Sequence, residues 1–121
     1  MADWMQITRA VVFPWHCDQY GHMNVRWYAH FFDDASFLSW SCLGLDMQKL
    51  HEAGTHTAVV RSAIEFKQEL RAGAQVALNG RFSALGTTSV QLEQQMLDQR
   101  SSATCATHES VLVFCDSATR Q

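Results

Sequence analysis

The feature that most constrains the fold is a long apolar helix predicted over residues 25–43. Aromatic and small apolar side chains recur there at intervals of three and four residues, which is the period of one helix face. Trp27 and Trp40 lie off that stripe, so we expect a helix that is apolar almost all round and buried on several sides. Asn24 is a good N-cap residue, and Gly44 can end the helix.

The rest of the sequence predicts β-strands. Apolar and polar side chains alternate in one segment before the helix and in four after it, and a period of two is typical of half-buried strands. Pro14, the only proline in the chain, closes the first strand, and a short second helix is expected at residues 46–53. The predicted strands are residues 6–13, 58–66, 74–82, 89–97 and 104–115.

The connections between the four later strands are short. They fall at residues 71–73, 85–88 and 98–102. Because turns of this length join antiparallel neighbours, we expect these strands to form a meander. The order of one strand, a helix and then four strands predicts an α+β fold, with residues 1–121 forming a single domain.

Composition narrows the classes of function and location. A chain of 121 residues is long enough for one domain, and its formal net charge of −3 argues against nucleic-acid binding, which needs a basic face. No apolar run approaches the roughly 18 residues of a membrane span, and the first residues lack the pattern of a signal peptide. The four cysteines form no C-x-x-C pair, so we expect free thiols and a cytoplasmic location.

Chemically active side chains gather just before the long helix, in W-H-C-D-Q-Y-G-H-M-N-V-R-W-Y at residues 15–28. Asp18 precedes His22 by four residues, with Gly21 between them to make a turn. The first amides of a helix have no partner within it and lie at the positive end of its dipole. A carboxylate aimed at them can act as a base or nucleophile facing an oxyanion site, which makes acyl transfer the leading hypothesis.

Two motifs carry a resemblance to a known family. They are H-C-D-Q-Y-G-H-M-N at residues 16–24, followed by Tyr28 and Phe32, and A-V-V-R-S-A-I-E-F at residues 58–66. With them, the chain resembles the hotdog-fold acyl-CoA thioesterases, in the branch that includes 4-hydroxybenzoyl-CoA thioesterase. The resemblance spans residues 5–115 and implies a long central helix wrapped by a five-stranded antiparallel sheet.

This chain departs from the family's pattern at two positions. Val25 stands where many relatives have a second Asn, and Ala74 follows Gly73 where many relatives have Asp. The first departure bears on substrate contacts, and the second concerns only a turn. Neither departure affects Asp18.

The resemblance implies hydrolysis of an acyl- or aroyl-CoA thioester to the free acid and coenzyme A. Asp18 would attack directly to give a mixed anhydride, or would take a proton from an attacking water. Backbone N–H groups near Asn24 and Val25 would form the oxyanion hole. His22 would orient Asp18, bind substrate or, in the interpretation we prefer, help build the turn. This chemistry requires no metal and no cofactor.

Several residues keep an alternative interpretation. Asp18 could be a structural carboxylate that accepts hydrogen bonds from the turn at Gly21. Tyr28 either lines the acyl pocket or belongs to the core. Arg61 either contacts the coenzyme A phosphates or is an exposed arginine that pairs with Glu65.

Other chemistries at the same motif stay open as minor alternatives. Cys17 could act as a nucleophile with His22, although no third orienting residue is evident. The remaining histidines have no partner at a suggestive spacing and are expected on surfaces or at interfaces: His30, His51, His56 and His108. A metal cluster would have to be built from His16, Cys17, Asp18 and His22.

Two further functions compete with hydrolysis. Asp33 and Asp34 lie within the predicted helix and admit a hotdog-fold enoyl-CoA hydratase or dehydratase. A non-catalytic hotdog dimer that binds acyl-CoA is the other alternative. In all three cases the expected partner is an acyl-CoA small molecule, with no nucleic acid and no membrane.

The predicted elements also bear on assembly. Long strands at the edges of a sheet leave backbone groups unpaired, and the predicted helix is too apolar to be covered by one sheet layer. We therefore expect a homodimer in which two sheets join, with a dimer of dimers as a further option.

Overall fold

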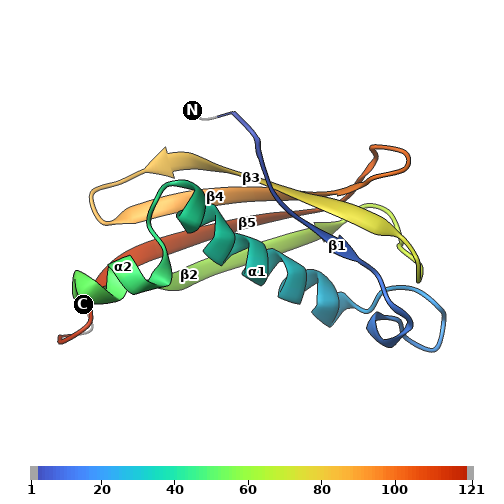
Figure 1. Ribbon diagram of the computed structural model, residues 1–121, viewed down its shortest axis with the longest axis horizontal. Coiled ribbons are helices and arrows are strands. Elements are labelled where there is room, and N and C mark those ends of the chain that lie inside the picture. Colours follow the sequence, from blue (N-terminus) through green and yellow to red (C-terminus); the bar gives the residue numbers. More distant parts are fainter. Residues whose placement is uncertain (1–2, 120–121) are drawn as a thin grey trace.

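The long helix α1 (Val25–Cys42) lies across one face of a five-stranded antiparallel sheet that curves around it (Figure 1). This arrangement confirms the predicted α+β hotdog fold. The computed structural model describes residues 3–119. The other elements are β1 (Met5–Val11), a 3-10 helix (Pro14–His16), α2 (Met47–Glu52), β2 (Thr55–Phe66), β3 (Gln75–Leu85), β4 (Ser89–Asp98) and β5 (Thr104–Asp116).

Local sequence sets the ends of the helices where the pattern predicts them. Asn24 has an extended backbone, and its Oδ1 accepts the N–H of Arg26 at 3.1 Å, which makes it the N-cap of α1. Gly44 follows the helix with φ +79°, a left-handed conformation that favours glycine. Asp46 caps α2 by accepting the N–H of Lys49 at 2.9 Å.

One face of α1 forms the centre of the core. Phe32 is fully buried, and Tyr28 and Ala35, about one turn away on either side, are nearly so. At Gly80 the helix and the sheet approach closely, because a Cβ there would lie 3.3 Å from Ser39 Oγ. The helix residues pack against a cluster of buried strand residues: Val76, Leu78, Met96, Cys105 and Ala106.

The opposite face of α1 is open in the single chain. Phe37 is 44% exposed and Leu38 is 43% exposed. The prediction that the helix is buried on several sides is therefore wrong for a single chain, because the one-layered sheet covers only one of its faces. Across residues 3–119, no helix combines the length and apolarity needed to cross a membrane.

The order of the strands differs from the predicted meander. It is β1-β3-β4-β5-β2, so β2 pairs with β5 and not with β3, although the pairs β3–β4 and β4–β5 are as expected. The expectation that β2 and β3 are neighbours is wrong because residues 67–74, which join them, do not form a hairpin. Those residues cross from the β5 side of the sheet to the β1 side.

The crossing connection is tied down at both ends and in the middle. The N–H of Lys67 donates to the carbonyl of Cys105 at 2.9 Å, and the N–H of Gly73 donates to the carbonyl of Val12 at 2.7 Å. Leu70 is buried, and its carbonyl accepts the N–H of Met23 at 2.7 Å. The connection therefore closes one end of the core and supports the segment that leads into α1.

Two leucines on β3 test where the core lies. Leu78 is 1% exposed and Leu85 is 73% exposed. Leu78→Ala should lower the free energy of unfolding by about 3 kcal/mol, because it removes buried methyl groups and leaves a cavity. Leu85→Ala should change it by about 0.5 kcal/mol or less. Urea unfolding followed by circular dichroism measures both variants, and similar losses would contradict the packing described.

Candidate functional site

Asp18 is held in a tight turn just before α1. Its Oδ1 accepts the backbone N–H of Tyr20 at 2.9 Å and that of His22 at 3.4 Å, and its own N–H donates to the His22 carbonyl at 2.9 Å. Gly21 has φ +80°, which favours glycine, and its N–H donates to the Asp18 carbonyl at 3.0 Å. The turn therefore fixes the direction of the carboxylate.

The turn uses only one oxygen of this carboxylate. Oδ2 of Asp18 accepts no hydrogen bond from any of residues 3–119. The side chain lines a hollow of about 440 Å³ that Val25, Tyr28 and Phe66 also line. Structural support and a chemical role are thus compatible in the same residue, since one oxygen holds the turn and the other is free.

The start of α1 beside Asp18 leaves one amide unused. The N–H of Asn24 donates to the His16 carbonyl at 2.8 Å, and the N–H of Arg26 is capped by Asn24. The N–H of Val25 has no acceptor within residues 3–119, and Val25 lines the same hollow as Asp18. The helix-start donors expected near Asn24 and Val25 are thereby narrowed to the amide of Val25.

His22 links the turn to the crossing connection. Its backbone pairs with Arg71, and its Nε2 lies 3.1 Å from Oε2 of Glu69, a close contact that lacks hydrogen-bond geometry. The imidazole therefore faces Glu69, while His22 contacts Asp18 through backbone groups. Glu69 could not be predicted from the sequence, because its place beside the motif depends on the path of residues 67–74.

His16 anchors the segment that precedes Asp18. Its ring is buried against Trp27 and Phe31, and its Nδ1 accepts the N–H of Phe13 at 2.9 Å. Burial lowers the pKa of His16, and the nearby His30 acts in the same direction. A buried neutral imidazole whose Nδ1 is engaged in this way supports the loop.

The geometry of the motif does not support a cysteine nucleophile or a metal site. The thiol of Cys17 is directed to the carbonyl of Phe13, 3.7 Å away, and the imidazole of His22 faces Glu69. The two side chains are therefore not arranged as a nucleophile and its base. Within residues 3–119, no group of three or more His, Cys, Asp or Glu side chains is placed to hold a metal ion.

Tyr28 and Arg61 lie in different places. Tyr28 is 4% exposed, packs edge-on against Phe66 and also lines the Asp18 hollow, so it belongs to both the core and the site. Burial raises the pKa of Tyr28 to about 12. Arg61 is exposed and lies outside that hollow, with Nη1 3.2 Å from Oε1 of Glu109, so its predicted pairing with Glu65 is wrong.

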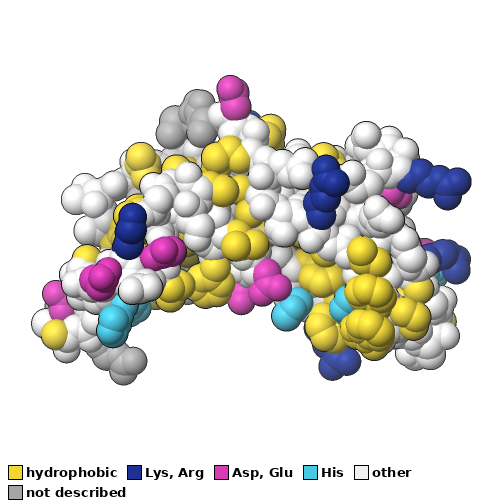
Figure 2. All heavy atoms as spheres, in the orientation of Figure 1, with side chains coloured by type: hydrophobic (Ala, Val, Ile, Leu, Met, Phe, Trp, Pro, Cys, Tyr) yellow, Lys and Arg dark blue, Asp and Glu magenta, His cyan; other side chains and the backbone are white. Residues whose placement is uncertain are grey.

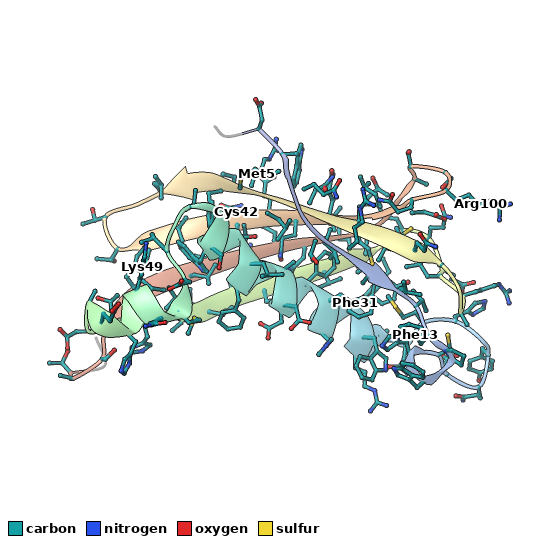
Figure 3. All side chains as sticks on the ribbon, viewed as in Figure 1. Met5, Phe13, Phe31, Cys42, Lys49 and Arg100 are labelled. Atoms are coloured by element: carbon teal, nitrogen blue, oxygen red, sulfur yellow. The ribbon has the colours of Figure 1, made fainter. Side chains whose placement is uncertain are left out.

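Aromatic side chains gather on the surface at this end of the molecule. Phe13 and Trp15 stack with ring centroids 4.5 Å apart, and Trp15 and Tyr20 are 64% and 73% exposed. Figure 2 shows the hydrophobic atoms concentrated there, and Figure 3 places Phe13 near Phe31 of α1. This surface borders the Asp18 turn, to which Tyr20 belongs.

A second polar group lies beneath α1, where the sequence pattern did not predict one. His108 is buried in β5, so its predicted place on a surface or at an interface is wrong for the single chain. Its Nε2 lies 2.6 Å from Ser62 Oγ and its Nδ1 lies 2.6 Å from Gln94 Oε1. The available signal was that Gln94 and His108 occupy inward positions of strands whose other inward residues are mostly apolar.

Solved structures resemble this chain closely in fold. The hypothetical protein SAV2348 from Staphylococcus aureus, solved in complex with CoA, has a TM-score of 0.89 at 14% identity, covering 100% of this chain and 77% of that one. A DHNA-CoA thioesterase from Staphylococcus aureus has a TM-score of 0.86 at 15% identity, covering 98% and 78%. Slr0204, a 1,4-dihydroxy-2-naphthoyl-CoA thioesterase from Synechocystis, has a TM-score of 0.83 at 15% identity, covering 94% and 84%.

Sequence comparison identifies the family directly. No curated protein matches the chain at a significant level. A family model described as the thioesterase-like superfamily matches residues 12–121, a range that includes the Asp18 turn, the whole of α1 and strands β2 to β5. With the hotdog fold and this match over most of its length, the chain belongs to the thioesterase-like superfamily.

Proposed function

We propose that this protein is an acyl-CoA thioesterase that hydrolyses an acyl- or aroyl-CoA to the free acid and coenzyme A. The observation that carries the proposal is the carboxylate of Asp18, which is fixed through Oδ1, free at Oδ2 and shares one hollow with Val25, whose amide is unused. Membership of the thioesterase-like superfamily supports it. Similar folds in a CoA complex and in two CoA thioesterases are in accord with it.

The chemistry needs few groups because a thioester carbonyl is already reactive and a thiolate is a good leaving group. Oδ2 of Asp18 attacks the carbonyl carbon, the C–S bond breaks, and water then hydrolyses the mixed anhydride. Alternatively, Asp18 takes a proton from a water that attacks the same carbon. In both routes the N–H of Val25, at the positive end of α1, donates to the oxygen that develops negative charge.

The remaining predicted residues have supporting roles in this proposal. His22 and Asn24 shape the turn and the helix start, through the backbone contacts of His22 and the cap that Asn24 provides. Tyr28 forms one wall of the acyl site. Arg61 lies outside the hollow, so a contact with coenzyme A phosphates stays a prediction for that residue. A reducing cytoplasmic location also stays a prediction, and Cys17, Cys42, Cys105 and Cys115 are all free thiols.

The hydratase alternative has less support from the geometry. Asp33 and Asp34 are both exposed, and Asp34 Oδ2 lies 3.3 Å from His30 Nε2 along the helix surface. The buried His108 has both ring nitrogens engaged, by Ser62 and Gln94, so neither is directed at a helix carboxylate. Incubation with an enoyl-CoA, followed by analysis for the hydrated product, separates this function from hydrolysis.

Substitution of Asp18 tests the proposed chemistry. Asp18→Asn keeps an oxygen that can accept the N–H of Tyr20, so the turn should persist, but it removes the carboxylate. Hydrolysis of responsive substrates in a panel of acyl- and aroyl-CoA thioesters, followed by free-thiol detection, should fall by about 100-fold or more. Asp34→Asn, at an exposed position on α1, is the matched control. Parent-like turnover by Asp18→Asn would overturn the assignment of the site.

We also propose that the active form is a homodimer in which the β2 edges of two copies pair. β2 spans Thr55–Phe66 and hydrogen-bonds only to β5, which leaves its outer edge unpaired within the described sheet. Val59 and Val60 on this strand are 58% and 61% exposed. A long edge strand that carries exposed valines is a template for pairing with a second copy.

A charge at the β2 edge should break this dimer. Val60→Asp places two like charges near each other across the proposed contact, so the variant should sediment as a monomer at concentrations where the parent is a dimer. Val11→Asp is the matched control, because Val11 is a 39% exposed valine on the opposite edge strand β1. Sedimentation equilibrium decides the question, and loss of the dimer in Val11→Asp alone would assign the contact to the other edge.

A further inference from the structure

A second hollow of about 540 Å³ lies between α1 and the β2–β5 side of the sheet. Apolar side chains, among them Phe37, Trp40 and Val59, form much of its lining. Besides Thr57, the lining residues on β2 and β5 that carry a hydroxyl are Ser62 and Ser110. None of its lining residues lines the Asp18 hollow. The two hollows are therefore separate places on the molecule.

The hydrogen bonds at the base of this second hollow fix the tautomer of His108. Nε2 of Gln94 donates to the carbonyl of Phe32 at 3.0 Å, so Oε1 of Gln94 is the atom that faces the imidazole. Because Oε1 can only accept, Nδ1 of His108 carries the proton. Nε2 then has a free lone pair, and the hydroxyl of Ser62 donates to it across 2.6 Å.

Burial keeps this imidazole suited to act as a base. His108 is 9% exposed and packs against the ring of Phe32, with ring centroids 5.2 Å apart. Burial lowers the pKa of His108, an effect that the nearby carboxylate of Asp33 opposes. A histidine whose pKa is lowered stays uncharged down to a lower pH, so it can accept a proton at neutral pH.

A free hydrogen-bond donor lies beside the Ser62 hydroxyl. Ser110 is directly opposite Ser62 in the β2–β5 ladder and lines the same hollow. It is 2% exposed, and its Oγ has no hydrogen-bond partner among the described residues. A buried hydroxyl without a partner is costly, and a ligand oxygen in the hollow would satisfy it.

We propose that Ser62 is the nucleophile of a second acyl-transfer centre, with His108 as its base, Gln94 as the residue that orients the base, and Ser110 as an oxyanion donor. A nucleophile within hydrogen-bond reach of a base that a third group orients is the arrangement that activates serine in hydrolases. The apolar part of the lining, which includes Phe37, Trp40 and Val59, suits an ester or thioester of an apolar acid. Within one chain, this hollow shares no lining residue with the Asp18 hollow.

The reaction at this centre closes without a further reagent. Ser62 Oγ attacks the carbonyl carbon while its proton passes to His108 Nε2. The bond to the leaving alcohol or thiol breaks, and that group takes the proton from the imidazolium, leaving an ester on Ser62. Water then attacks the ester and gives its proton to His108, and the free acid departs as the proton returns to Ser62 Oγ.

Covalent labelling of the full chain with an alkyl fluorophosphonate tests the proposal. Ser62 Oγ should displace fluoride and bond to phosphorus, and peptide mass spectrometry should find the adduct on Ser62. Ser62→Ala should remove the adduct, and His108→Gln, which can still accept a hydrogen bond but is not a base, should slow labelling by about 100-fold. Ser83→Ala is the control, because Ser83 is a strand serine whose Oγ lies 3.5 Å from the Gln91 carbonyl.

A second variant keeps the test decisive if His108→Gln does not fold. Ser62→Cys places a thiol beside Nε2 of His108, and its alkylation by iodoacetamide at neutral pH should be about tenfold faster than that of Ser83→Cys, because the base draws off the proton. Equal rates, an absent adduct, or an adduct on another serine would each overturn the proposal. Neither readout uses acyl-CoA, so failure of the Asp18 mechanism would leave both measurements unaffected.

Discussion

Packing of one face of α1 against the sheet is the contact on which the other features of this protein depend. Phe32 lies at its centre with no exposed surface, and β3 approaches the helix closely where Gly80 meets Ser39. The Asn24 cap sets where the helix begins, and this contact fixes how the helix lies on the sheet. The same contact also fixes the position of the α1 residues that line the hollow with Ser62 and His108. One buried interface thus positions two hollows of different chemistry.

The sequence predicts the local parts of this fold well. The cap at Asn24, the glycine after α1 and the alternation along the strands depend on residues close together in the chain, and their predicted elements lie within a few residues of the observed ones. The pairing of β2 was not predictable in the same way. It depends on whether residues 67–74 turn back or cross the end of the core, and a short segment with a glycine near its end is compatible with both paths.

The two hollows also differ in how far apart in the chain their residues lie. The Asp18 turn is contained in a few consecutive residues, so its shape follows from Gly21 and from the short reach of an aspartate side chain. The second hollow requires Ser62, Gln94 and His108 to meet from three strands, and that meeting depends on the registers of β2 with β5 and of β4 with β5. The sequence alone shows only that polar residues occupy inward positions. It does not show which side chains they hydrogen-bond to.

The place of β2 in the sheet has a consequence for how the chain reaches its native state. β2 forms its hydrogen bonds with β5, the last strand of the sequence, so β2 has no strand partner until the C-terminal segment is available. The chain leaves the ribosome N-terminus first, so β2 emerges before β5. Until β5 follows, the valines of β2 must avoid contacts with other chains. Closing the sheet joins segments that are far apart in the chain, which makes it a costly step in chain entropy. The final strand therefore gives β2 its strand partner and completes the sheet, which limits misassociation through the β2 edge that faces β5.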